Sequence, residues 1–455
     1  MLKARWKVFG FQNAHPRLPI LVILIIVGPY WLVFVPGIEA RMGLIPQLVA
    51  GYGRSGTTAL MSLLGTDSRV AMSRDYPFED RYLTYVSKLA ILLERNVIQP
   101  PLSAEELYSF EGCGLGGFPW APPGPATGRL DEAGLPGAAE WFRSLWAVID
   151  EKSQRQHPTA AFYAEKVPAW VSPFVRHYLP TRTFYLFRDP RDMYLSANAF
   201  MRRRNYFSFG RGPKDSDLDH ARNLAYEFLL YYENFRVDRH RADCMLVPYA
   251  DLIRDREGLV GRLRRFAGLE CLDQAAAHGL ESHRTSASPE VSLDRWRREP
   301  LPPGVLSFLE TYLQESFAAL HYEPAAPGKI RCCPGAEFAN ENENGLRVPV
   351  ERGRFSIELP IDAFPSDSVT EIWVSAFGPA LDEISLSWRT PERDYSHRRR
   401  LSLPAYGGPH WRVFRFPVGR HERWHGRIAR LQLQMTFNSL PYDDAVYLRW
   451  VRLVE

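Results

Sequence analysis

Lysine and cysteine are both scarce in this chain of 455 residues. Seven of its 56 basic residues are lysine and 49 are arginine, so anion recognition must rest mostly on planar guanidinium groups. The five cysteines are odd in number, and none of their spacings is typical of a metal site. No Asn-x-Ser/Thr glycosylation site occurs in the sequence. These absences favour a reducing, cytoplasmic setting and give no reason to expect a metal ion.

A strong net charge is also absent. The formal charge is +4, and 24% of the residues are charged. This balance argues against a nucleic-acid-binding protein, which would carry a strongly basic face. Hydrophobic residues make up 45% of the chain, which is ordinary for a packed globular protein, and the length predicts two or three domains.

A glycine-rich turn follows the first strand-like segment after the N-terminal region. Residues 47–52 (QLVAGY) read as a short buried strand, residues 51–58 (GYGRSGTT) as the turn, and residues 59–64 as an apolar helix. This order is typical of a phosphate loop, because backbone N–H groups at the helix start point at the anion. Thr57 occupies the place of the lysine in ATP- and GTP-binding loops, and Arg54 supplies the positive charge instead.

A second strand-to-helix junction lies at residues 183–196. The segment TFYLF reads as a strand, and Arg188 stands at its end. Asp189 is a good helix N-cap, Pro190 suits the first helical position, and Asp192 can reach back as in a capping box. Ser196 then lies two turns into the predicted helix, eight residues after Arg188.

These two motifs resemble the donor-binding motifs of sulfotransferases that use PAPS, 3′-phosphoadenosine 5′-phosphosulfate. Residues 54–58 (RSGTT) are similar to the family's 5′-phosphosulfate loop, in which cytosolic members carry Lys and tyrosylprotein and many bacterial members carry Arg. Arg188 and Ser196 resemble the pair that binds the 3′-phosphate. Residues 244–252 and 295–322 are similar to later family elements, so the resemblance covers residues 47–322.

The resemblance implies a fold, a donor and a set of binding residues. The fold would be α/β, a P-loop-like parallel sheet with helices on both faces. PAPS would be the donor, with no metal. Arg295 is included because a loop near such an Arg and Trp often closes over the nucleotide in the family. The donor-binding residues would be Gly53, Arg54, Ser55, Gly56, Thr57, Thr58, Arg188, Ser196 and Arg295.

The catalytic groups are expected from the chemistry of sulfonate transfer. A base must take the acceptor proton, and cations must hold charge on the departing oxygens. Arg54 is the first candidate for the second role, and Lys166 resembles a family lysine that reaches the sulfonyl group. The histidine that cytosolic members place two residues later is Pro168 here, so the base is expected to be a carboxylate, either Asp75 or Glu79.

Three functions from different classes fit this pattern unequally. The first is a sulfotransferase that acts on a hydroxyl or amine of a glycan or glycolipid. A P-loop kinase-like transferase is the second, and the missing loop lysine and the pair formed by Arg188 and Ser196 count against it. The third is a non-catalytic glycan-binding protein, against which the intact motifs count. The acceptor is not readable, because family acceptor pockets use variable loops such as residues 103–134 here.

The C-terminal quarter changes pattern. Residues 324–345 read as a linker between a sulfotransferase domain, residues 46–323, and a β-sandwich, residues 346–455. The last strands resemble those of carbohydrate-binding jelly-roll modules, and Trp373, Trp388, Trp411 and Trp424 form either a sugar platform or core. The predicted strands are 355–359, 371–377, 384–388, 400–403, 411–416, 428–437 and 446–454.

The N-terminal segment, residues 1–45, contains an uncharged run at residues 18–38, long enough to cross a bilayer. Basic residues precede it, which alone would favour a single-pass anchor with the rest of the chain outside. Gly28-Pro29 divides the run into two halves too short to span, which favours a re-entrant hairpin. A hairpin would leave the catalytic domain on the cytoplasmic face, where a bacterium makes the donor. A buried element of the globular domain, or a true start at Met42, would also account for the run.

Overall fold

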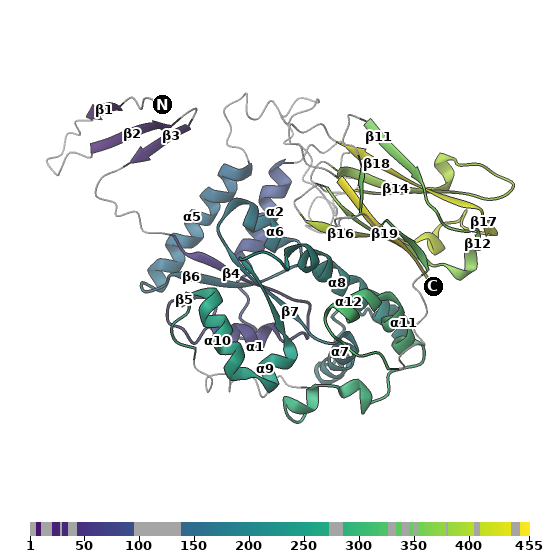
Figure 1. Cartoon of the computed structure of the whole chain (residues 1–455), viewed down its shortest axis with the longest axis horizontal. Coiled ribbons are helices and arrows are strands. Elements are labelled where there is room, and N and C mark those ends of the chain that lie inside the picture. The colour runs from purple at the N-terminus through teal and green to yellow at the C-terminus, as the bar shows by residue number, and fades with distance from the viewer. Residues whose placement is uncertain are drawn as a thin grey trace. The chain divides into compact units, whose positions relative to one another are not determined.

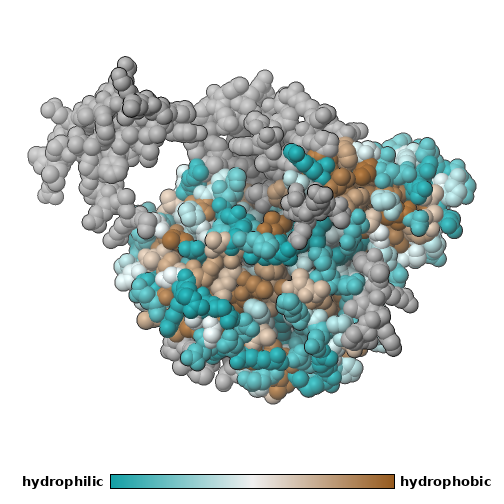
Figure 2. Space-filling model, viewed as in Figure 1, coloured by the Kyte–Doolittle hydropathy of each residue, from teal (hydrophilic) through white to brown (hydrophobic). Residues whose placement is uncertain are grey.

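The computed structural model divides the chain into two compact units, residues 1–44 and 45–455. Figure 1 shows their strands and helices. Hydrophilic and hydrophobic residues are interspersed on the described surface in Figure 2, as is usual for a globular protein. The structure describes residues 6–10, 21–27, 30–34, 43–94, 138–272, 285–325, 334–338, 345–348, 353–378, 381–404, 410–437 and 446–455.

The first unit contains a small antiparallel sheet in the order β1 (Trp6–Gly10), β2 (Leu21–Val27) and β3 (Tyr30–Phe34). Val27 pairs with Tyr30, so the chain direction reverses within the uncharged run. The run is rich in Ile and Val, whose branched side chains favour strands. Among the described residues, no helix is both long enough and apolar enough to cross a membrane.

The second unit is built around a parallel sheet, as the sequence predicted. The strand order is β5 (Val70–Ala71), β6 (Phe162–Val167), β4 (Ile45–Ala50), β7 (Arg182–Phe187) and β8 (Cys244–Pro248). Ala50 pairs with Val167 on one side and Tyr185 on the other, so β4, β6 and β7 end at the same edge. That carboxyl edge is where open α/β sheets bind ligands.

Side chains of β7 show how both faces of the sheet are covered. Phe184 and Leu186 pack in the core with α1 (Thr57–Leu64) and α10 (Arg256–Ala267). Tyr185 and Phe187 point to the other face, where their rings contact Phe235 of α8 (Asp217–Asp238). Because successive strand residues alternate faces, one apolar strand serves both layers. The prediction of helices on both faces is confirmed.

The remaining helices pack around the sheet or, like α11, against α7 and α8. Helix α7 follows β7 directly, and α9 follows β8. Their bounds are α2 (Tyr82–Glu94), α5 (Ala138–Gln156), α6 (Val171–Tyr178), α7 (Pro190–Arg204), α9 (Tyr249–Arg254), α11 (Val305–Tyr312) and α12 (Gln314–Ala319), with short 3₁₀ turns η2 (Glu290–Ser292) and η3 (Arg295–Arg297).

The C-terminal region is a sandwich of two antiparallel sheets, as predicted. One has the order β10, β19, β13 and β16, with β9 also paired to β19, and the other has the order β11, β18, β14 and β15. Strand β9 lies inside the predicted linker. The strand bounds are β9 (Gly335–Glu337), β10 (Leu346–Val348), β11 (Gly353–Glu358), β12 (Phe364–Pro365), β13 (Glu371–Phe377), β14 (Leu381–Arg389), β15 (Arg400–Pro404), β16 (Trp411–Phe416), β17 (Arg427–Ile428), β18 (Arg430–Phe437) and β19 (Val446–Val454).

The tryptophans of the sandwich are core residues. Trp373 and Trp388 have no exposed surface, and Trp411 and Trp424 expose only 4% and 7%. The indole N–H of Trp388 donates to the carbonyl of Arg423, which satisfies the buried donor. Of the two roles that the sequence left open for these four residues, the structure therefore supports the core and not a sugar platform.

Helix α8 binds the sandwich through buried polar groups. Asn234 donates to the carbonyl of Trp411 and accepts from its N–H, at 3.1 and 3.0 Å. The fully buried carboxylate of Glu233 accepts from the indole of Trp450 and pairs with Arg449. A buried charge needs such partners, so the same helix that supports β7 also fixes the sandwich.

Candidate active site

The glycine-rich turn lies at the carboxyl end of β4 and requires two left-handed residues. Arg54 has φ 71° and Gly56 has φ 106°. A Cβ at Gly56 would lie 2.5 Å from the ring of Tyr249, so only glycine fits there. Helix α1 then begins at Thr57 without a side-chain cap. The hydroxyl of Ser55 is buried and has no hydrogen-bond partner among the described residues, which leaves it available to an anion at the helix start.

Arg54 crosses from the turn to helix α7. Its Nε donates to Oγ of Ser196 at 3.2 Å, and its guanidinium stacks on Phe200, 4.6 Å from the ring centroid. Burial, and then the nearby charge of Arg188, lower the pKa of Arg54 from its usual value. A cation held in this way is already in place before a ligand arrives.

Arg188 reaches the same turn from the end of β7. Its Nη1 donates to the carbonyl of Arg54 at 3.2 Å, and its Nη2 donates to the carbonyl of Ser292 at 2.6 Å. Its Nε is buried without a partner in the described parts of the chain. The hydroxyl of Ser196 also lies 3.0 Å from that of Thr285. The structure thus brings Arg54, Arg188 and Ser196 together, although they come from three different segments.

Lys166 joins the site from the end of β6. Its ammonium lies 2.8 Å from Oγ1 of Thr58, 2.6 Å from the carbonyl of Pro77 and 3.3 Å from a carboxylate oxygen of Glu79. Burial lowers the pKa of Lys166, and the pair with Glu79 opposes this shift. Lys166 is therefore a mostly buried cation at the phosphate loop and not a surface lysine at a strand end.

The two candidate bases lie in different surroundings. Glu79 is half-buried and also bonds Arg81 at 2.5 Å. Burial raises the pKa of Glu79, but the Arg81 bond and the charge of Lys166 outweigh it and hold the pKa below its usual value. Asp75 is exposed, and its backbone carbonyl accepts from the N–H of Phe78. Of the two, only Glu79 contacts Lys166.

Arg295, at the start of η3, reaches the site through Thr285. Its Nε and Nη2 bond the carboxylate of Glu299 at 2.6 and 2.7 Å, and its Nη1 reaches the carbonyl of Thr285 at 3.4 Å. Arg295 therefore contacts Thr285, which in turn contacts Ser196. The adjacent Trp296 donates its N–H to Asp192 at 2.9 Å. The prediction that Asp192 acts in a capping box is wrong. Its carboxylate accepts from the N–H of Trp296 in the η3 turn, and not from the N-terminus of its own helix.

Several residues around the site had no predicted role. The ring of Tyr249 lies under Arg188, 4.5 Å from its guanidinium carbon, and its hydroxyl bonds Ser292 at 2.9 Å. Phe209 covers Gly53, where an added Cβ would lie 2.5 Å from the ring. The only sequence signal among these residues was Tyr249 at the end of a strand. Ser292 and Thr285 come from loops far along the chain.

In the parts that the structure describes, no group of three or more His, Cys, Asp or Glu is placed to hold a metal ion.

Comparison with solved structures finds matches of low similarity, which include two sulfotransferase domains. The sulfotransferase domain from the curacin biosynthetic pathway is 15% identical, with a TM-score of 0.38, and the match covers 62% of this chain and 99% of that one. The sulfotransferase domain of the Synechococcus PCC 7002 olefin synthase is 17% identical, with a TM-score of 0.37, over 62% and 96%. Retinol dehydratase in complex with retinol and PAP is 17% identical, with a TM-score of 0.31, over 65% and 90%.

The sequence itself places the chain in a family. A comparison with curated proteins finds no match. The model of the sulfotransferase family matches residues 46–274, half of the chain, and this range contains the phosphate loop, Lys166, Arg188 and Ser196. The chain belongs to the sulfotransferase family.

Proposed function

We propose that this chain transfers the sulfonyl group of PAPS to a hydroxyl, or an amine, of a glycan or glycolipid. The observation that carries the proposal is the convergence of Arg54, Arg188 and Ser196 at the carboxyl edge of the parallel sheet. A donor that carries phosphates at both the 3′ and the 5′ positions of its ribose needs two anion sites a few ångströms apart. A simple mononucleotide would leave the second site without a partner.

The side chains divide between these two anions. Ser55, with the helix N-terminus behind it, would bind the 5′-phosphosulfate, and Arg54 and Lys166 would hold its charge. Ser196 and the partnerless Nε of Arg188 would bind the 3′-phosphate. The site fits such a donor because its buried polar atoms would gain the partners that the described protein residues do not supply.

The transfer is an in-line displacement. The acceptor oxygen forms a bond to sulfur while the bond between sulfur and the bridging phosphate oxygen breaks, and PAP leaves with that oxygen. The acceptor proton goes to the carboxylate of Glu79, which the Lys166 pair orients. Arg54 and Lys166 stabilise the negative charge that grows on the departing phosphate. The products are a sulfate ester, PAP and a proton.

Exposed aromatic rings support a ring-shaped acceptor. Tyr76 is 40% exposed, Tyr206 49% and Phe207 55%, and they are among the few large apolar side chains exposed in the described residues. Tyr76 and Tyr206 lie close enough to Arg54 to act on its pKa. Aromatic faces beside a polar reaction centre are typical of pockets for small rings, including sugars.

A transfer assay tests the proposal directly. The protein is incubated with PAPS and a panel of neutral glycans, glycolipids and amines, and PAP release and the mass of each acceptor are measured. We expect PAP to form together with one added sulfo group on a glycan or glycolipid. PAP formation with no modified acceptor, or modification only of amines that belong to neither a glycan nor a glycolipid, would contradict the proposed acceptor class. Failure to bind PAP would overturn the donor assignment.

We further propose that residues 18–38 associate with a membrane and leave the catalytic unit on the cytoplasmic face, with a single-pass anchor as the alternative. The uncharged run supports membrane association, and Gly28-Pro29, which divides it into halves too short to span, supports a hairpin with both flanks on one face. Single cysteines near Ala14 and Ala40, in a background without the native cysteines, are treated with an impermeant thiol reagent. The proposal expects both to react only after lysis. Reaction of the Ala40 site in intact cells would indicate the single-pass anchor.

A further inference from the structure

Two neighbouring segments of the sandwich are strongly basic. Residues 389–400 contain five arginines and two acidic residues, and residues 420–430 contain four arginines and one acidic residue. Their formal charges are +3 and +3, so together they hold +6. The whole chain has +4, and the remainder is therefore slightly acidic, at −2. These 23 residues are therefore one of the strongly basic parts of the chain.

The two loops are fixed against each other by the sandwich core. The N–H of Ala429 donates to the carbonyl of Arg389 at 2.9 Å, and Arg389 pairs with Arg430 where β14 meets β18. The indole of Trp388 bonds the carbonyl of Arg423, and the same indole stands edge-on against His421, with the ring centroids 4.8 Å apart. The arginines therefore stand on a rigid base.

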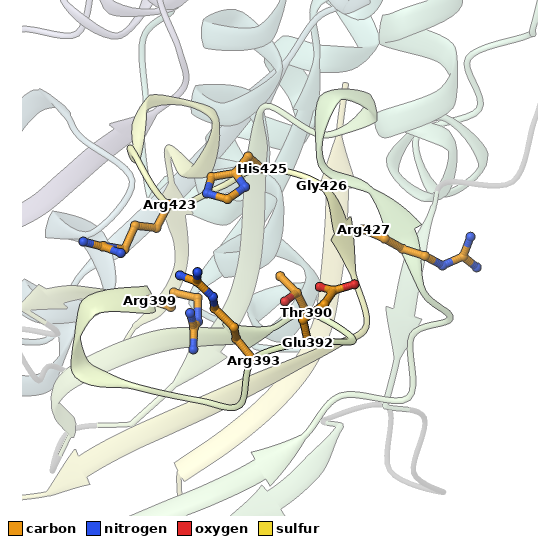
Figure 3. A pocket seen from close by; sticks show the side chains of 8 residues that line it. All are labelled: Thr390, Glu392, Arg393, Arg399, Arg423, His425, Gly426 and Arg427. Carbon is orange, nitrogen blue, oxygen red and sulfur yellow. The ribbon is translucent and has the colours of Figure 1, made fainter.

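A pocket of about 260 Å³ lies between these loops, and we call it the arginine pocket. Figure 3 shows the side chains of Arg393 and Arg399 turned toward its middle, with that of Arg427 directed outward. The volume is below the roughly 300–1,000 Å³ that is usual for pockets of drug-sized ligands, so the recess suits one small group and not a large molecule. Its lining includes Arg393, Arg399, Arg423, His425 and Arg427, with Glu392 as the acidic member.

Donors in this pocket are available to a ligand. No hydrogen bond or ion pair of the Arg393 side chain is found among the described residues, and Nε of Arg399 is buried without a partner there. Arg399 donates its Nη2 to the carbonyl of Asp394, which orients the guanidinium. Arg423 has only a 3.4 Å pair with the exposed Glu422 in the part of the chain that the structure describes. An anion in the pocket would give the buried Nε of Arg399 a partner and could also bind the exposed guanidinium of Arg393.

Arginines dominate the described lining of the arginine pocket. The four sandwich tryptophans are buried, and the large apolar side chains that the described surface exposes all belong to residues 76–291. Charge is therefore the main means by which the arginine pocket could recognise a sugar, with the exposed ring of His425 beside it. Acidic neighbours such as Asp394 and Glu422 interrupt the basic surface, which disfavours an extended polyanion such as nucleic acid or an anionic membrane.

We propose that the arginine pocket binds a sulfate-bearing sugar of a glycan chain. This deepens the proposed function, on which it rests: the enzyme would hold, at a second site, a group of the kind that it makes. A partly sulfated chain would then stay bound between transfers, while a neutral chain would dissociate. Guanidinium forks match the geometry of oxyanions, and the recess admits one such group at a time.

A binding assay on the full-length protein tests this without any catalysis. Fluorescent dextran-sulfate oligosaccharides, the same oligosaccharides without sulfate, and carboxymethyl-dextran are titrated by anisotropy at about 50 mM salt. We expect the sulfated probe to bind best and the neutral probe not to bind. The double variant Arg393→Ala/Arg399→Ala should weaken binding at least about tenfold, the scale of one or two charge-assisted hydrogen bonds.

A matched control removes the same charge from the same loops outside the pocket. Arg398 and Arg420 are exposed and do not line it. The variant Arg398→Ala/Arg420→Ala should change affinity less than about threefold, the scale of a purely long-range charge effect. Equal losses in the two variants would mean general charge attraction and would overturn the pocket. Thermal unfolding shows whether each variant is folded, and Arg393→Ala/Arg423→Ala replaces the first if Arg399→Ala destabilises the sandwich.

Other ligands give distinct outcomes. Tighter binding to carboxymethyl-dextran than to the sulfated probe would replace sulfate by a uronic-acid type of ligand and overturn the proposal as stated. Binding of vesicles containing anionic lipid, or of an oligonucleotide, that depends on Arg393 would also overturn it. Because no donor is present, loss of sulfonate transfer with intact probe binding would reject the proposed function and leave the pocket in place.

Discussion

The two arginine clusters of this molecule differ in how their charges are held. At the edge of the parallel sheet, Arg54 and Arg188 are fixed by a hydroxyl, two carbonyls and aromatic rings. In the arginine pocket of the sandwich, Arg393 and Arg427 are exposed. Cations that are already held in place in a buried site need little reorganisation when charge develops in the transition state. Exposed cations are screened by water and salt.

This difference indicates a division of labour. The buried cluster is suited to chemistry, which needs charge at a defined position. The exposed cluster is suited to retention of a ligand, which needs only attraction and a recess. The predictions below follow from this contrast, and each one strengthens or breaks it.

The largest effect is expected for Arg54→Ala. Its guanidinium lies where negative charge develops, so turnover should fall about a thousandfold while the acceptor KM changes little. Steady-state kinetics at saturating PAPS measure both values. Arg265→Ala, which removes an exposed arginine from α10, is the control and should retain full turnover. A large rise in KM with unchanged turnover would assign Arg54 to ground-state binding instead.

The next effect separates the two carboxylates. Glu79→Gln should lower the rate at least about a hundredfold, because a general base contributes on that scale. Asp75→Asn should retain nearly full activity, because the exposed Asp75 does not contact Lys166. The rates of both variants are compared in one transfer assay. A reversed pattern would make Asp75 the base, and full activity of both would rule out a carboxylate base.

A smaller effect is expected on nucleotide selectivity. Arg188→Ala should weaken PAP binding about tenfold or more, the value of a charge-assisted contact, and leave AMP binding unchanged. Calorimetry with the two nucleotides measures the ratio, and AMP serves as the internal control. Equal affinity of the unmodified protein for PAP and AMP would remove the basis for the 3′-phosphate site.

The smallest expected effect is the difference in how salt changes the ligand affinities of the two clusters. Raising the salt concentration from about 50 to about 200 mM should weaken binding of the sulfated probe several-fold, because exposed charges are screened over about a Debye length. PAP binding should weaken less over the same range, because Arg54 and Arg188 are largely buried. Parallel titrations of the two ligands give the slopes. Identical slopes would contradict the contrast between fixed and solvated charges.

The sequence predicted the parts of this structure that depend on local pattern. The strands at residues 371–377 and 411–416 were predicted with the bounds observed, because alternation of side chains and turn residues is local. Arg54, Arg188 and Ser196 were predicted from two short motifs. Their positions follow from strand ends, and parallel strands bring those ends to one edge.

Tertiary contacts were beyond that pattern. Ser292 and Thr285 were not predicted, because no local signal connects them to Arg188 and Ser196. The choice between Asp75 and Glu79 depends on a turn in which Phe78 and Arg81 have positive φ values of 63° and 58°. Residues other than glycine rarely adopt a positive φ. Spacing along the chain therefore could not show which carboxylate reaches Lys166.

The buried Glu233 has a consequence for how the chain assembles during synthesis. It lies 216 residues before its partner Arg449. Arg236 of the same helix also pairs with it at 3.5 Å, but burying both without Arg449 would still leave the carboxylate short of a close partner, at a cost of several kcal/mol. We expect α8 to keep Glu233 in water until β19 has been made. The nucleotide-binding half would then complete its folding only when β19 of the sandwich is available. The two halves would become native together, and the incompletely folded chain would be a substrate for chaperones until then.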